Sequence, residues 1–221
     1  APSSLPDASD DLLRRVGDLY AHDAELGRLW SEALAAHAMA GRAGPRQDPA
    51  SLGKLAAGFL ARADGPRIAM IETGGWDTHS AQNPRLAAQL KALDTMVGAL
   101  HDELGAVWAD TTVVVATEFG RTAAANGTAG TDHGTGSLAM LVGGAVAGGR
   151  VMADWPGLRA NDLYEGRDLR PTTSLDALVA GAAAETFGLD PAHAVTALFP
   201  KRRSLAPVTG VVVAIGAARN A

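Results

Sequence analysis

Short apolar runs alternate with amphipathic helical patterns along this chain, and the alternation constrains its fold more than any other feature. Residues 67–72, 111–117 and 138–142 are rich in apolar or β-branched residues and have the length of strands. The run at 111–117 contains no charged residue, which is typical of a strand buried on both faces of a parallel sheet. Because strands that alternate with helices are typical of α/β proteins, we expect an α/β fold.

The helices are predicted from apolar residues that recur at every third or fourth position. We expect helical regions at residues 7–39, 51–63, 83–104 and 174–187. The third of these begins with Asn83 and Pro84, which are typical of the first positions of a helix, and it ends before Gly105. The fourth is expected to be capped near Ser174 and to end at Gly188.

Three parts are expected along the chain: a helical segment at residues 1–50, an α/β domain at 51–200 and a tail at 201–221. Within the tail, residues 208–215 predict either a strand or a disordered end. Residues 1–11 lack the basic start and the apolar stretch of a signal peptide, and the chain does not begin with methionine. We therefore expect a processed protein or a fragment.

The composition excludes several classes of function. A net charge of -5 and an isoelectric point near 5.6 give no broad basic surface, so binding of nucleic acid through its phosphates is not expected. The chain has no cysteine, which excludes thiolate catalysis, disulfides and cysteine-based zinc sites. Any metal must therefore be bound by oxygen and imidazole nitrogen. No apolar stretch has the length of a membrane span.

Three turns that carry acidic or histidine side chains lie beside the apolar runs. Their sequences are Gly74-Gly75-Trp76-Asp77-Thr78-His79, Thr117-Glu118-Phe119-Gly120-Arg121-Thr122 and Gly130-Thr131-Asp132-His133-Gly134. Parallel sheets bind ligands beyond the carboxyl ends of their strands, where loops are free to carry chemistry. We therefore expect the polar side chains of these turns to gather at such an edge.

The first and third of these turns each contain an aspartate and a histidine close enough in sequence to bind one metal ion. Asp77 and His79 are two residues apart, so on an extended segment both side chains point the same way and can bind one cation. The alternative is a turn-capping aspartate beside a surface histidine. Asp132 and His133 lie among glycines that allow a close approach, so His133 can bind a transition metal. Asp132 would either bind that metal or orient His133.

The remaining turn places Glu118 at the end of the uncharged run, where its carboxylate needs a partner. Arg121, three residues on, would neutralise it in a plain structural pair. The functional alternative has Glu118 on a metal and Arg121 holding an anionic group with two hydrogen bonds.

Together with Asn126 and Gly143-Gly144, these motifs resemble the signature of the DUF1501 family over about residues 52–200. That family is distantly similar to the sulfatase and alkaline phosphatase superfamily. The resemblance implies a three-layer α/β/α sandwich like that of alkaline phosphatase. We expect this sandwich to be incomplete here, because no strand followed by an aspartate and a hydroxyl nucleophile precedes the first motif.

The resemblance also implies a function. It implies a hydrolase of a small anionic ester, a phosphate or a sulfate, with a divalent zinc, manganese or calcium ion. The expected metal ligands are Asp77, His79, Glu118, Asp132 and His133, and the expected substrate-binding residues are Arg121 and Asn126. Members of the family often carry an export signal, so a periplasmic or secreted location is expected. The alternative is a non-catalytic binding or assembly module that keeps the hydrolase-like fold. Neither a nucleophile nor an oligomeric state is predicted.

Overall fold

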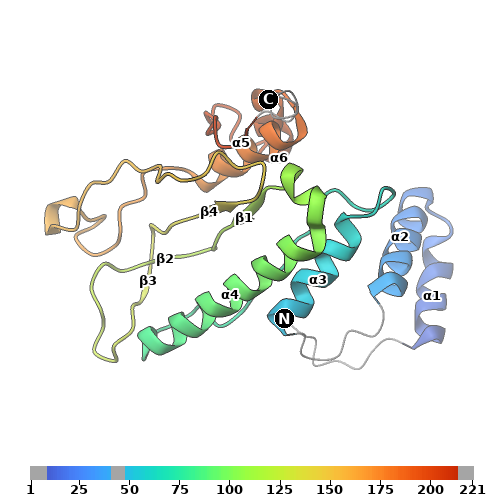
Figure 1. Cartoon of the computed structure of the whole chain (residues 1–221), viewed down its shortest axis with the longest axis horizontal. Coiled ribbons are helices and arrows are strands. Elements are labelled where there is room, and N and C mark those ends of the chain that lie inside the picture. Colours follow the sequence, from blue (N-terminus) through green and yellow to red (C-terminus); the bar gives the residue numbers. More distant parts are fainter. Residues whose placement is uncertain (1–8, 41–47, 214–221) are drawn as a thin grey trace.

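A computed structural model describes residues 9–40 and 48–213 of the protein, and these residues form a mixed α/β fold (Figure 1). In chain order the elements are α1 (Asp10–Tyr20), α2 (Ala24–Ala40), α3 (Pro49–Leu60), α4 (Gln82–Leu104), the 3-10 helix η1 (Gly105–Asp110), β1 (Val113–Val115), β2 (Gly120–Arg121), β3 (His133–Gly134), β4 (Met140–Val142), the 3-10 helix η2 (Ala160–Asp162), α5 (Leu175–Phe187) and α6 (Pro191–Leu198). The α/β class is therefore confirmed. Over the same residues, no helix combines the length and hydropathy needed to cross a membrane.

The strands form two antiparallel pairs. β1 pairs with β4, with Val113 opposite Val142, and β2 pairs with β3, with Arg121 opposite His133. The parallel sheet predicted from the apolar runs is therefore wrong for these strands. The chain turns back on itself through the β2–β3 hairpin between β1 and β4, and such a return needs no helical crossover.

Two clusters of buried apolar residues cover the two faces of the β1–β4 pair. On one face Val113 packs against a cluster of α3 and α4 that contains Ala57, Leu100 and Leu104. On the other face Leu141 packs against a cluster that contains Ala182 of α5. Because side chains alternate across a strand, Val113 and Leu141, which is opposite Val114, point to different faces. Figure 1 accordingly shows these strands between α4 on one side and α5 with α6 on the other.

Residues 67–72, predicted as a buried strand, form no strand in the structure. Most of this run is exposed, and Met70 is 92% exposed. The physical reason is that a strand is held by hydrogen bonds to a neighbour. No backbone group of residues 66–77 forms a backbone–backbone hydrogen bond with another described residue. An apolar and β-branched sequence alone therefore does not make this run a strand.

The long helix begins differently from the prediction. α4 starts at Gln82, and the residue before it is Ala81, which has a left-handed backbone with φ of 45°. The Ala81 N–H donates to the carbonyl oxygen of Thr128, 3.0 Å away. Contact with a distant loop, rather than the side chain of Asn83, therefore fixes this helix start. The predicted end at Gly105 is confirmed.

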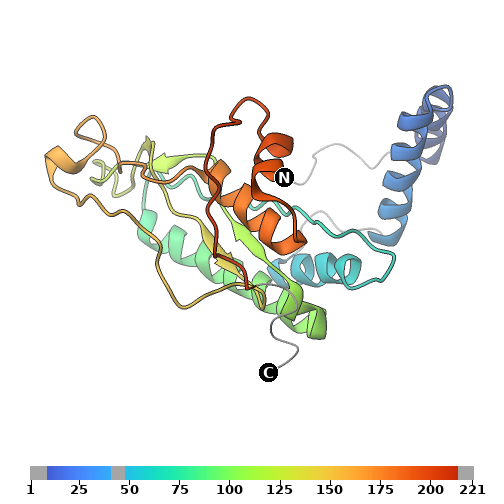
Figure 2. The ribbon, with the colours of Figure 1, turned by 90° about the horizontal axis from the view of Figure 1, so that it is seen from above.

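The other helical predictions are confirmed with small shifts in their ends. Residues 10–40 form two helices, α1 and α2, which pack against each other at one end of the molecule (Figure 2). α3 begins at Pro49 behind the cap Asp48, two residues before the expected start. α5 lies between Ser174 and Gly188 as expected. The division of the chain into three parts stays a prediction.

The tail contributes to the core up to the last described residue. Val211 and Val212 are buried, and their N–H groups each donate to the Glu185 carboxylate of α5 over 2.8 Å. Val212 also forms an isolated β-bridge with Val146. A disordered end is therefore wrong for residues 208–213, whereas the rest of the predicted strand lies outside the described residues.

The close packing of the tail on α5 predicts how a glycine-to-alanine substitution in that helix changes the stability of the protein. A Cβ at Gly181 would overlap the carbonyl oxygen of Val208, whereas a Cβ at Gly98 of α4 would meet no atom within 4 Å. We expect Gly181→Ala to lower the free energy of unfolding by about 1–3 kcal/mol, because the core is overfilled. Gly98→Ala should instead raise it by roughly 0.5–1 kcal/mol. Urea unfolding followed by circular dichroism measures both, and equal effects would contradict the described packing.

Candidate metal centre

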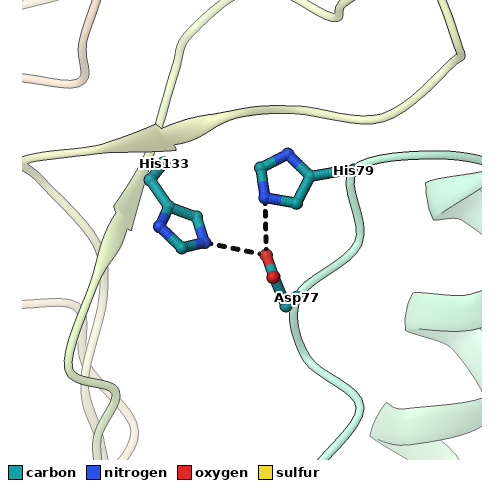
Figure 3. A group of neighbouring side chains, drawn as sticks. All are labelled: Asp77, His79 and His133. Atoms are coloured by element: carbon teal, nitrogen blue, oxygen red, sulfur yellow. Dashed lines mark hydrogen bonds and ion pairs between the residues drawn. The ribbon is translucent and has the colours of Figure 1, made fainter.

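Side chains from two distant parts of the chain meet at one point. Asp77 and His79 lie in the loop before α4, and His133 lies in β3. Their ligand atoms, one from each residue, all lie within 4.8 Å of one another, and all three side chains are exposed. Figure 3 shows both rings directed at the carboxylate. Within residues 9–40 and 48–213, no other group of His, Asp or Glu side chains meets this criterion.

One oxygen of Asp77 is the centre of this group. Asp77 Oδ1 lies 2.9 Å from His79 Nε2 and 2.8 Å from His133 Nε2. It also accepts a hydrogen bond of 3.3 Å from Arg121 Nη2. A carboxylate oxygen with three such neighbours is strongly stabilised in its charged form. The hydrogen bond from His133, then the positive charges of His79, His133 and Arg121, hold the pKa of Asp77 below its ordinary range.

His79 faces a carboxylate from both ring nitrogens. Its Nε2 points at Asp77, and its Nδ1 lies 3.0 Å from Oδ1 of Asp132. Both contacts are hydrogen bonds at the same time only if the ring carries both protons. A cation bound at Nε2 would take the place of one proton, while Nδ1–H would still donate to Asp132. This arrangement is the usual one for a metal-binding histidine, whose other nitrogen is oriented by a carboxylate.

Asn126 fixes Asp132 from the other side. The Asn126 amide nitrogen donates to Asp132 Oδ1 over 3.0 Å and to the carbonyl oxygen of His79 over 2.9 Å. Its amide oxygen accepts from the backbone N–H groups of Thr128 and Gly130. The hydrogen bond from Asn126, followed by that from His79, lowers the pKa of Asp132. Asp132 therefore orients His79, whereas the sequence had paired it with His133.

Glycine allows the two segments to approach this closely. A Cβ at Gly130 would overlap the backbone of His79, and a Cβ at Gly134 would lie 2.6 Å from the Arg121 carbonyl carbon. The second of these contacts falls inside the β2–β3 hairpin, where Gly134 follows His133. Glycine is therefore needed for the approach of the two segments, whereas the expected close approach to a ligand stays a prediction.

Phe119 contacts two residues of the site, His133 and Arg121, and no role was predicted for it from the sequence. Its ring stacks on the His133 ring with 4.4 Å between centroids and 10° between planes. The guanidinium of Arg121 lies over the Phe119 ring, 4.7 Å from its centroid. These contacts restrict the orientation of His133. Phe119 lies inside one of the three motifs, which indicates that it is near the site, but its position does not predict that it stacks on His133.

The sequence matches the family described as "Protein of unknown function (DUF1501)" over residues 6–199. The chain belongs to the DUF1501 family. No curated protein and no solved structure matches the chain. The resemblance drawn from the motifs is therefore confirmed for the family. The more distant similarity to sulfatases and alkaline phosphatases stays a prediction.

The two substrate-binding candidates of this DUF1501 protein are engaged in internal contacts. Arg121 donates to the carbonyl oxygens of Thr131 and Trp76 over 2.9 and 2.6 Å, in addition to Asp77. These bonds tie the hairpin to the loop that carries Asp77. Asn126 is bonded as described above. Direct substrate contact by either side chain stays a prediction.

Glu118 lies outside the group that the other candidates form in the DUF1501 protein. It is exposed, it lies in the bend after β1, and it forms no hydrogen bond or ion pair among the described residues. The structural pair with Arg121 is absent there, because Arg121 contacts Asp77 instead. Its role as a metal ligand stays a prediction.

Asp168 is a further residue that the sequence did not single out. Its side chain is buried, and its Oδ2 accepts a hydrogen bond of 3.0 Å from the Thr135 hydroxyl, two residues after His133. No local spacing predicts this contact, because the two residues are 33 positions apart and Asp168 lies outside the helices and named strands.

The donor set fits a metal ion. Two imidazole nitrogens and one carboxylate oxygen form a common set for transition metals in proteins. Atoms bound to one such ion at about 2.0–2.2 Å lie roughly 3–4 Å apart, close to the separations described here. The Asp77 carboxylate supplies the negative charge of this donor set, and its lowered pKa extends that charge to more acidic pH.

The bond from Asn126 predicts the titration of Asp132. We expect Asn126→Ala to raise the pKa of Asp132 toward its ordinary value of 3.8, because the largest stabilising contact is lost. A lowered pKa stabilises the fold above pH 3.8, and that contribution is lost as the pH falls through the folded-state value. The stability of the variant should therefore depend less on pH in this acidic range.

Carbon-13 NMR titration of the side-chain carboxylates in metal-free protein measures this shift. Asp64 is the internal control, because its pKa is lowered by Arg62 and not by Asn126. An unchanged Asp132 titration in the variant would contradict the described hydrogen bond.

Proposed function

We propose that this DUF1501 protein is a metal-dependent hydrolase that acts on a small anionic ester, a phosphate or a sulfate. The observation that carries the proposal is the convergence of Asp77, His79 and His133 on one point. The three side chains are exposed, so an ion at this point would be accessible to a substrate. A periplasmic or secreted location, implied by the family resemblance, is part of the proposal.

The ligand chemistry supports zinc or manganese over calcium. Calcium takes six to eight oxygen ligands, whereas zinc and manganese accept imidazole nitrogen. Asp77, His79 and His133 supply one oxygen and two nitrogens. A site with three protein ligands also leaves coordination positions for substrate, as in catalytic zinc sites.

A bound ion would polarise the ester and lower the pKa of a water molecule that it holds. The protein's own side chains then have distinct roles. Asp132 orients His79, and Phe119 orients His133. The Thr78 hydroxyl, which adjoins Asp77, is buried and donates to Gln82, so it does not serve as a nucleophile. We therefore assign the nucleophile to water.

The fold supports the comparison with alkaline phosphatase in one respect. The β1–β4 pair lies between a cluster of α3 and α4 and a cluster of α5. A layer of strands between two layers of helices is the arrangement of a three-layer α/β/α sandwich. We propose that the protein has this architecture.

A second candidate function is a non-catalytic binding or assembly module. The observation that favours it is that the side chains contact one another directly. Asp77 Oδ1 contacts both rings, and Asp132 contacts His79, so the group also forms a continuous hydrogen-bonded network. Such a network requires no ion.

Metal content distinguishes the two candidates. We expect about one equivalent of zinc or manganese per chain in protein purified without chelator, because three ligands define one site. Asp77→Ala and His133→Ala should each reduce the metal to background. His101→Ala is the matched control, since His101 contacts Asp102 over 2.8 Å in an exposed pair that has no third ligand. Elemental analysis measures the metal, and metal-free wild type after incubation with both ions would refute the metal site.

Ester hydrolysis tests the chemistry separately. We expect metal-loaded protein to hydrolyse p-nitrophenyl phosphate or p-nitrophenyl sulfate. Asp132→Asn should lower metal affinity or turnover by about 10–100-fold, because His79 loses its orienting carboxylate. Release of p-nitrophenol, followed by absorbance, measures the rate. Bound metal without turnover of either ester would contradict the hydrolase and favour the binding module.

A further inference from the structure

A buried carboxylate lies next to the β2–β3 hairpin, because Asp168 forms an isolated β-bridge with Thr122. Asp168 is only 4% exposed, although it carries a carboxylate. It belongs to a turn in which Tyr164 and Asp168 exchange two backbone hydrogen bonds of 3.0 Å. We call residues 157–170, which project beside the hairpin in Figure 1, the arm. Buried carboxylates need a charged partner, and the partner here is the neighbouring arginine.

Asp168 holds Arg167 by one edge of its guanidinium. Arg167 Nε lies 2.7 Å from Asp168 Oδ1, and Nη2 donates to Oδ2 over 3.3 Å. Oδ1 accepts no hydrogen bond, so the Nε contact is an ion pair and Nη2 makes the one hydrogen bond. The other terminal nitrogen, Nη1, forms no hydrogen bond with another described residue and keeps both of its N–H groups for another acceptor. The Arg167 side chain is 63% exposed despite this anchor. The Arg167 side chain is therefore held by Asp168 and is also accessible to a ligand from solvent.

The backbone places Arg167 two extended segments away from the candidate metal centre. The N–H of Ala123 donates to the carbonyl oxygen of Arg167 over 3.0 Å. The N–H of the preceding residue, Thr122, donates to the carbonyl oxygen of Asp132 over 3.0 Å. Hydrogen-bonded extended segments lie about 4.8 Å apart, and the segment of Thr122 and Ala123 lies between the other two. The backbones of Arg167 and Asp132 are therefore roughly 10 Å apart across these segments.

Arg167 and Arg121 differ in what their donors already bind. Arg121 is 22% exposed and donates to two carbonyl oxygens and to Asp77, so it holds the hairpin to the loop. Arg167 contacts one carboxylate by one edge and leaves its other edge open. An anion needs free N–H donors on a guanidinium, and Arg167 supplies them.

We propose that Arg167, held in place by Asp168, binds the anionic group of the ligand at the Asp77–His79–His133 site. This inference rests on the proposed function and names the residue that selects a negatively charged ester. Asp168 is then a positioning residue, and its bond to Thr135 couples the arm to the segment that carries His133.

The test measures binding of inorganic phosphate to the zinc-loaded full chain by isothermal titration calorimetry. Arg167→Gln removes the charge, and Arg167→Lys keeps the charge without the planar fork. Arg62→Gln is the matched control, because Arg62 contacts Asp64 through the same two nitrogens, Nε and Nη2, over 3.1 Å. Zinc content and circular dichroism are measured on each sample first.

We expect Arg167→Gln to bind phosphate at least about tenfold more weakly, the loss expected for a charge-assisted hydrogen bond, with unchanged zinc content. Arg167→Lys should be intermediate, and Arg62→Gln should match the wild type. If Arg167→Gln does not fold, the weaker binding of Arg167→Lys decides the question.

Two negative outcomes are distinguishable. Wild type that binds no zinc would overturn the proposed function and this inference together. Zinc-loaded wild type whose phosphate affinity is absent, or is unchanged in both Arg167 variants, would overturn the role of Arg167 and leave the metal site standing.

Discussion

The Asp77 carboxylate joins parts of the chain that no regular element connects. In the loop before α4, residues 66–77 form no backbone–backbone hydrogen bond with another described residue, and the β2–β3 pair is only two residues long on each side. The contacts of Asp77 Oδ1 with His133 and Arg121 link this loop to the hairpin. The position of the site therefore depends on side-chain contacts, on glycine packing and on a few backbone hydrogen bonds such as that from Ala81 to Thr128, rather than on a large sheet.

The arm, residues 157–170, is joined to the hairpin by further hydrogen bonds. Thr122 of the hairpin bonds to Asp132 on one side and forms an isolated bridge with Asp168 on the other. Asp168 in turn accepts from Thr135, which follows the strand that carries His133. A displacement of the arm would therefore reach the metal-ligand candidates through these hydrogen bonds. These contacts connect the buried carboxylate of Asp168 to the segment that carries His133.

The sequence predicted the parts of the site that depend on local spacing. Asp77 and His79 are two residues apart, and His133 lies among glycines, so these residues were identifiable as candidate ligands, and the structure brings their side chains together. The partners of Arg121 were not, because the three-residue spacing to Glu118 favoured a local pair, whereas the contact that forms spans 44 residues. The strand predicted at 67–72 failed for a similar reason, since strand pairing depends on a neighbour that the local sequence does not specify. Asp168 gave no signal, because burial of a charge depends on the tertiary arrangement.

Stability does not account for the gathering of these charged groups. The side chains of Asp77, His79, Asp132 and His133 are all about half exposed, and exposed ion pairs contribute little to folding. The close approach also requires glycine at 130 and 134, and glycine increases the entropy that the chain loses on folding. An arrangement that constrains the backbone and returns little stability is better explained by a ligand that uses it. The exposure of the rings and of Arg167 is consistent with that explanation, because the proposed anionic ester would have to reach both.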